Sequence, residues 1–85
     1  MNSVNIIGCL LETIDEKHRY MEYELPFLQE NNKVKPIIVV KYWTEQSNTR
    51  LNVLEKGTRV AISGHLDASE KYGTILIVEE LQSLR

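Results

Sequence analysis

The sequence predicts an all-β domain in which five short strands close into a small barrel. Two of the expected strands carry a glycine, Gly8 and Gly64, just before the strand becomes polar. A glycine inside a strand usually marks a bulge or a sharp bend. Bent strands allow a small sheet to close on itself. A short segment with helical spacing between the third and fourth strands completes the predicted architecture.

Length and composition indicate one ordinary globular domain over residues 1–85. Hydrophobic residues make up 42% of the 85 residues and charged residues 26%. No run approaches the roughly 18 apolar residues that a membrane span needs, and no basic stretch leads into an apolar run as in a signal peptide. The single cysteine, Cys9, excludes an internal disulfide and favours a reducing, cytoplasmic location.

The first half of the chain predicts three strands. Val4 to Leu11 forms the first, and the polar segment Thr13 to Arg19 is a loop. Tyr20 to Leu28 alternates, which puts Met21, Tyr23, Leu25 and Phe27 on one face. Glu30 to Lys33 is typical of a hairpin turn. Val34 to Trp43 forms the third strand, with Ile38, Val40 and Tyr42 on one face and Lys35, Ile37, Val39, Lys41 and Trp43 on the other.

The second half predicts a helix and two strands. Ser47 to Leu54 breaks the alternation, and Leu51 and Leu54 indicate a short helix. Arg59 to Leu66 is the fourth strand, Asp67 to Gly73 a polar hairpin loop, and Thr74 to Leu84 the fifth strand. In the fifth strand we expect Ile75, Ile77 and Leu81 to point inward.

Five strands with a helix between the third and fourth are the order of an OB-fold barrel. An SH3-like barrel is the rival fold, but it would not need a helix at Ser47 to Leu54.

Three segments resemble the bacterial single-stranded DNA-binding protein family and its relative, primosomal replication protein B. They are MNSVNIIG-x-L at residues 1–10, L-x-KG-x-x-V-x-x-x-G-x-L at residues 54–66, and VEELQSL at residues 78–84. The resemblance implies an OB fold, binding of single-stranded DNA and a homodimer or homotetramer. The Met1 to Asn5 edge is a candidate pairing strand, because an unpaired edge is a template for another chain.

Candidate binding residues follow from the resemblance and from the alternation. The resemblance aligns Trp43 with an aromatic that stacks on a base, and the alternation puts Trp43 on the face of Lys35 and Lys41. The hairpin aromatic is Tyr72. The candidate phosphate contacts are Lys35, Lys41, Arg59, Lys71, Lys17 and Arg19. These features also have plainer interpretations. Trp43 could lie at a subunit interface, where aromatic residues are enriched. The hairpin and the basic run of residues 17–19 could be ordinary solvated loops.

The chain also departs from this family. Cys9 and His65 stand where the family commonly has Arg after each glycine. The family's acidic, Phe-ended tail is absent because the chain stops at Arg85, so we expect it to lack the tail's role in recruiting other proteins. The net charge of −2 is low for a nucleic-acid binder.

No motif indicates an enzyme, a metal site or a cofactor. His18, His65 and Cys9 lack the spacing of metal ligands, and no glycine-rich loop cradles a phosphate. Glu79 and Glu80 are adjacent in a predicted strand, so they point to opposite faces.

Two functional hypotheses remain. The first is sequence-independent binding of single-stranded DNA in replication, recombination or repair. The second is a protein-interaction module that holds a helicase, primase or recombinase and binds little DNA itself. The net charge and the missing arginines favour the second hypothesis.

Overall fold

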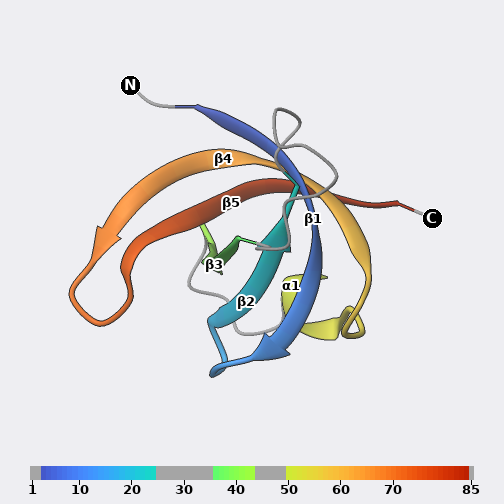
Figure 1. The fold of residues 1–85 in the computed structure, drawn as a ribbon, viewed down its shortest axis with the longest axis horizontal. Coiled ribbons are helices and arrows are strands. Elements are labelled where there is room, and N and C mark those ends of the chain that lie inside the picture. Colours follow the sequence, from blue (N-terminus) through green and yellow to red (C-terminus); the bar gives the residue numbers. More distant parts are fainter. Residues whose placement is uncertain (1–2, 25–35, 44–49, 85) are drawn as a thin grey trace.

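A computed structural model describes residues 3–24, 36–43 and 50–84 of the chain. Figure 1 shows the elements in chain order: β1 (Val4–Thr13), β2 (His18–Tyr23), β3 (Ile37–Tyr42), α1 (Arg50–Val53), β4 (Arg59–Ser69) and β5 (Gly73–Leu84). Three strands, a short helix and two strands are the order that the sequence predicts.

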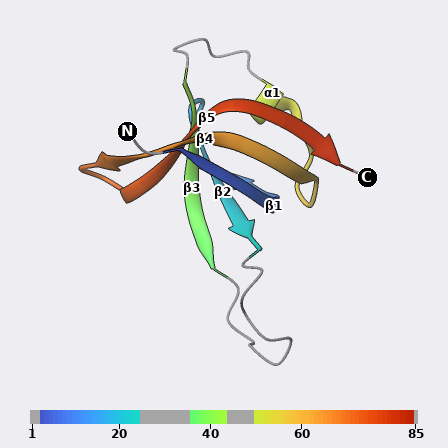
Figure 2. The same cartoon turned by 90° about the horizontal axis from the view of Figure 1, so that it is seen from above.

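The strands form one closed barrel in the order β1-β2-β3-β5-β4. Strand β1 closes the ring, because it pairs with β2 through one edge and with β4 through the other. All pairs are antiparallel except β3 with β5, which are parallel. Viewed from above, α1 lies at one end of the barrel (Figure 2). This is the predicted OB fold.

The core lies inside the barrel and receives side chains from all five strands and from α1. Its buried members are Leu10, Met21, Val40, Leu51, Val60, Ile62, Leu76, Val78 and Leu81. Half-buried side chains pack against them, namely Val4, Ile6, Tyr23, Ile38, Tyr42 and Leu54. The predicted short helix is confirmed over Arg50–Val53, where Leu51 is fully buried, and Leu54 just after it packs against the core.

The predicted bounds of the loop from Thr13 to Arg19 are wrong at both ends. Strand β1 runs through Thr13, and β2 begins at His18. The turn between them is tight because one carboxylate oxygen, Asp15 Oδ1, accepts hydrogen bonds from the backbone N–H groups of Lys17 and His18, each at 2.8 Å. An Asp that satisfies the backbone in this way allows the chain to reverse within few residues. Arg19 is therefore a strand residue.

The inward face of β5 also differs from the prediction. Leu76 and Val78 enter the core cluster, whereas Ile77 is only half-buried and Ile75 is buried outside that cluster. The predicted inward position of Leu81 is confirmed. Val78 and Leu81 are three residues apart, an odd spacing that simple alternation does not allow. The β4–β5 register shifts here, and Glu79 is the extra residue that lets both side chains point inward.

Gly64 lies opposite this bulge, and its lack of a side chain is a packing requirement. A Cβ at Gly64 would lie 1.9 Å from the carbonyl oxygen of Ile77. A Cβ at Gly8 would lie 2.5 Å from the carbonyl oxygen of Glu22. Both strands therefore approach a neighbour too closely for any other residue, which is the physical meaning of the two glycines in the sequence.

Several predicted features lie outside the described residues. They are Met1 and Asn2, the end of the second strand with Leu25 and Phe27, the hairpin at Glu30 to Lys33, and the start of the helix at Ser47. The loop predicted from Asp67 to Gly73 is shorter than expected. Strand β4 continues to Ser69, and β5 begins at Gly73. Of the described helical residues, none belongs to a helix long and apolar enough to cross a membrane.

Candidate nucleic-acid interface

The outer face of β2, β3 and β5 brings together several of the predicted binding residues. The strand registers place His18 next to Lys41, and Lys41 next to Ile77, with His65 of β4 following in the same row. The neighbouring row consists of Tyr20, Val39, Ile75 and Asp67. Lys41 is half-buried in the middle of this face, and Tyr20 is exposed.

Trp43 follows directly after β3 and lies on the same side as Lys41. Its backbone N–H donates a 2.9 Å hydrogen bond to the carbonyl oxygen of Val78, which fixes it against β5. Its side chain is 60% exposed, the outward placement that the alternation predicts. Trp43 lines an open cleft of about 430 Å³ with His65, Glu79 and Glu80. The backbone of Trp43 is thus held on β5, and its indole faces solvent.

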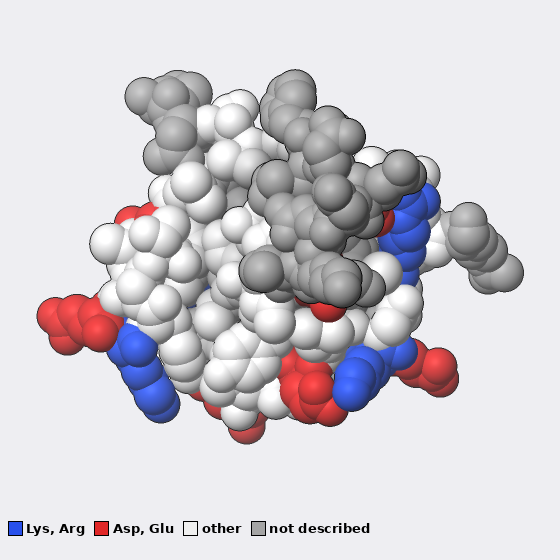
Figure 3. All heavy atoms as spheres, in the orientation of Figure 1, with Lys and Arg blue, Asp and Glu red and all other residues white. Residues whose placement is uncertain are grey.

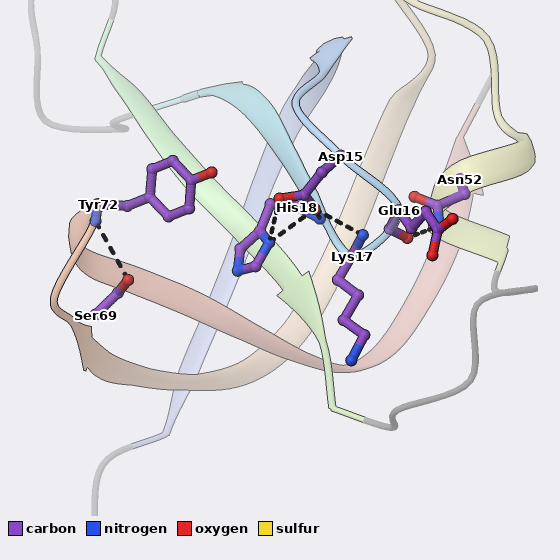
Figure 4. A network of polar contacts seen from close by, with 7 residues as sticks. All are labelled: Asp15, Glu16, Lys17, His18, Asn52, Ser69 and Tyr72. Atoms are coloured by element: carbon purple, nitrogen blue, oxygen red, sulfur yellow. Dashed lines mark hydrogen bonds and ion pairs between the residues drawn. The ribbon is translucent and has the colours of Figure 1, made fainter.

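Tyr72 comes from the turn between β4 and β5 and leans towards the start of β2 (Figure 4). The rings of Tyr72 and His18 have centroids 5.0 Å apart, and Lys71 Nζ lies 5.4 Å from the Tyr72 ring centroid. The Tyr72 hydroxyl is enclosed and has no hydrogen-bond partner among the described residues. Tyr72 therefore reaches the row that contains Lys41, but its ring is half-covered by its own neighbours.

His18 is a residue of this surface to which the sequence assigned no role. Its Nδ1 lies 2.9 Å from Asp15 Oδ1. The hydrogen bond with His18, with further ones from the backbone of Lys17 and His18, lowers the pKa of Asp15 to about 2. The pair fixes the β1–β2 turn and orients the imidazole towards Tyr72, as Figure 4 shows. The sequence signal that could have indicated this pair is an Asp three residues before a His in a turn.

Arg19 is not part of this surface, which corrects the sequence prediction. It is 2% exposed, and burial lowers its pKa. The guanidinium donates hydrogen bonds to the carbonyl oxygens of Leu11 at 2.8 Å, Leu51 at 2.7 Å and Leu54. Leu51 lies in α1 and Leu54 directly follows it, and carbonyls at the end of a helix lack intrahelical partners. Arg19 joins β1, β2 and α1, and no phosphate can reach it.

Arg59 lies on another part of the barrel. It begins β4, where its register partners are Cys9 and Leu84. Six residues separate it from His65, which is about 20 Å along a strand. Its guanidinium binds Glu24 through two hydrogen bonds of 3.0 and 3.2 Å, and this contact lowers the pKa of Glu24. The structure does not bring Arg59 together with Trp43.

The charge on the described surface is mixed. In Figure 3, Lys and Arg side chains lie beside Asp and Glu side chains and form no continuous basic field on the face shown. Lys56, for example, binds Glu12 at 2.9 Å. Of the predicted cations, Lys41, Lys71 and Lys17 lie on or beside the outer face of β2, β3 and β5, and Lys35 lies outside the described residues.

The part of the chain that the structure describes holds no group of three or more His, Cys, Asp or Glu side chains arranged to bind a metal ion. The outer face instead offers the exposed indole of Trp43, the exposed phenol of Tyr20 and the partly covered phenol of Tyr72, with Lys41 and Lys71 on or beside it. Such a surface can stack on flat rings and attract phosphates, which are the two parts of a binding site for single-stranded nucleic acid.

Comparisons with known proteins agree on the fold. No family model matches the sequence, and no curated protein is significantly similar to it. Among solved structures, the mitochondrial single-stranded DNA-binding protein Rim1 of S. cerevisiae matches with a TM-score of 0.68 and 14% identity, covering 100% of this chain and 98% of that one. The second single-stranded DNA-binding protein, SSBb, of Mycobacterium smegmatis matches with a TM-score of 0.61 and 14% identity, covering 96% and 87%. This chain therefore has the OB fold of these single-stranded DNA-binding proteins.

Proposed function

We propose that this protein binds single-stranded DNA, without requiring a sequence motif, on the outer face of β2, β3 and β5. The observation that carries the proposal is Trp43, an aromatic side chain that is 60% exposed yet anchored to β5 through its own backbone. Stacking of a base on an aromatic ring contributes about 1–3 kcal/mol and accepts every base. The OB fold shared with Rim1 and SSBb supports the same function.

The aromatic groups of this face bind bases, and its lysines bind phosphates. Trp43 stacks on one base, and Tyr72 presents its open side to another. Lys41 and Lys71 meet phosphates from the face and from the hairpin, and Lys17 meets them from the β1–β2 turn. Lys35, outside the described residues, is a further candidate. With so few cations, affinity is modest, and each phosphate contact contributes about −0.7 to the slope of log affinity against log salt.

Self-association would compensate for this modest affinity. Within the described residues, pairing of β2 with β1 begins at Gly8, with one further hydrogen bond from the Glu24 N–H to the Ile7 carbonyl. Among the residues that the structure describes, the part of β1 before Ile7 is paired with β4 alone. This edge is a suitable template for a second copy. A homodimer or homotetramer formed through it would join several weak sites and raise avidity.

Exposed single strands arise in replication, recombination and repair, and we assign the protein to these processes. We place it in the cytoplasm, because the lone thiol of Cys9 suits a reducing compartment.

Fluorescence titration tests the proposal directly. Trp43 is the only tryptophan, so its emission reports on one site. A mixed-sequence oligonucleotide should quench it, more weakly at high salt, and Trp43→Ala should lose most of the affinity. Absence of both quenching and binding at low salt would contradict the proposal.

A protein-interaction module for a helicase or primase is the second candidate. It is favoured by the engagement of Arg19 and Arg59 within the molecule and by the two carboxylates beside Trp43. In that case the unmutated protein would bind little DNA, and Trp43→Ala would leave binding of the partner intact.

A further inference from the structure

We propose that Glu79 and Glu80 make this protein prefer bases with an exocyclic amino group, cytosine above all, over uracil and thymine. The inference rests on the proposed function, because it concerns the base that stacks on Trp43. It assigns a role to two carboxylates that otherwise oppose binding of a polyanion.

The cleft beside Trp43 supplies only part of what a nucleotide needs. In the part of the chain that the structure describes, four residues line it, namely Trp43, His65, Glu79 and Glu80. The indole offers a flat surface, and the two carboxylates offer hydrogen-bond acceptors. One carboxylate oxygen of Glu79, Oε2, accepts a 2.5 Å hydrogen bond from Nδ1 of His65, which holds this carboxylate in place at the side of the cleft. None of the four residues is a lysine or arginine that would draw a phosphate into the cleft.

The placement of charge around Trp43 orients a bound strand. The carboxylates lie on the β5 side of Trp43, where the bulge of β5 brings Glu79 and Glu80 to the same cleft, which corrects the expectation that they point to opposite faces. A cationic group of the same face, Lys41, lies two residues before Trp43 on β3, between His18 of β2 and Ile77 of β5. Repulsion keeps phosphates away from the carboxylates and Lys41 attracts them, so the backbone passes on the Lys41 side of the indole. A base stacked on the indole then directs its outer edge towards β5.

The edges of the bases differ in what they offer to a carboxylate. Cytosine presents its N4 amino group, which donates to Glu or Asp. Uracil and thymine carry a carbonyl oxygen at the same position, and an oxygen facing a carboxylate is repelled. Adenine and guanine also carry amino groups, but their larger rings change stacking as well. Cytosine and uracil form the cleanest comparison, because they have the same ring size and neither carries a methyl group.

The test is a set of Trp43 fluorescence titrations with oligo-dC and oligo-dU of equal length, about twenty nucleotides. The pH is slightly alkaline, so that cytosine N3 stays unprotonated. We expect both to quench Trp43, with oligo-dC bound at least about threefold more tightly, a small effect because the carboxylates are solvated.

Two variants separate hydrogen bonding from charge. The double variant Glu79→Gln/Glu80→Gln should bring the ratio of the two affinities close to one, because a side-chain amide meets an amino or a carbonyl group equally well. The control Glu70→Gln removes a negative charge from the β4–β5 turn, away from the cleft. It should raise both affinities slightly and keep their ratio.

Each outcome decides a different point. Equal affinity of the unmutated protein for oligo-dC and oligo-dU would overturn this inference and leave DNA binding standing. A preference for cytosine that survives in the double variant would also overturn it, because the preference would then come from stacking. No quenching by either oligonucleotide would overturn the proposed function, and the inference with it.

Discussion

The guanidinium of Arg19 donates a 2.7 Å hydrogen bond to the carbonyl oxygen of Leu51, which lies 32 residues farther along the chain. This contact ties the start of β2 to the end of α1. Arg19, a cation in a basic run of the sequence, thus holds β1, β2 and the segment of α1 together, and we call its three hydrogen bonds the Arg19 clamp. Lys17, from the same run, lies in the β1–β2 turn.

Loss of this clamp should cost stability and leave DNA binding unaffected per folded molecule. Arg19→Ala deprives three buried or half-buried carbonyl oxygens of their donor, and we expect a loss of about 3 kcal/mol in the free energy of unfolding. Urea denaturation measures it. Lys17→Ala is the matched variant: it should leave stability nearly unchanged and lower the salt slope of DNA binding by about 0.7. An Arg19→Ala protein as stable as the unmutated one would contradict the clamp.

The Tyr72 hydroxyl should be dispensable for stability. It is enclosed without a hydrogen-bond partner among the described residues, and an unpaired buried polar group is unfavourable. We therefore expect Tyr72→Phe to be neutral or slightly stabilising, by up to about 1 kcal/mol. Tyr72→Ala should lose stability, because it removes the ring that packs near His18. Thermal unfolding of both variants tests this, and a clear loss in Tyr72→Phe would show that the hydroxyl is bonded.

The order of the elements was predictable from the sequence because it depends on local patterns. The alternation predicts the outward Trp43, the pair Leu51 and Leu54 predicts the helix, and the two glycines mark close approaches of strands. Each of these signals is contained within about ten residues. The OB fold followed from their order.

The details that failed depend on contacts between distant segments. Whether Arg19 faces solvent is decided by α1, which follows it by more than thirty residues. The inward face of β5 changes at Glu79 because of the register with β4, and nothing within β5 indicates that bulge. The partner of Arg59, Glu24, likewise comes from another strand's end. For these reasons, the candidate site could be predicted only as two aromatics with a set of cations, two of which are engaged elsewhere in the molecule, and without the carboxylates beside Trp43.

Arg59 should contribute little to DNA binding. It is held by Glu24 and lies about 20 Å along β4 from His65. Arg59→Ala should therefore change the affinity for an oligonucleotide less than about twofold, whereas Lys41→Ala should lower it several-fold and reduce the salt slope by about 0.7. Titrations at two salt concentrations compare the variants. An equal loss in both variants would mean that the strand extends around the barrel to Arg59.

Asp15 should make the β1–β2 turn sensitive to acid. Its pKa is about 2 in the folded protein, mainly because of the hydrogen bond with His18, against an ordinary pKa of 3.8. A lowered pKa stabilises the folded state above the unfolded value, and this stabilisation is lost as the pH falls from about 4 to about 2. The carboxylate is nearly half exposed, so we expect only about 0.5 kcal/mol. The stability difference between the unmutated protein and Asp15→Asn should disappear below that range. A difference independent of pH would assign the effect to turn geometry instead.

Gly64 should be the least replaceable glycine of the described strands. An alanine Cβ there would overlap the Ile77 carbonyl oxygen at 1.9 Å, and this oxygen is backbone held in the β4–β5 ladder. The strands would have to separate at the bulge, and we expect a loss of about 3 kcal/mol. Gly57→Ala is the control, because Gly57 has open space around its Cβ position and only a positive φ of 91°, which should cost about 1 kcal/mol. Urea denaturation ranks the two variants, and a Gly64→Ala protein that does not fold agrees with the prediction. If Gly64→Ala were instead the milder of the two, the close approach of β4 and β5 at the bulge would be wrong.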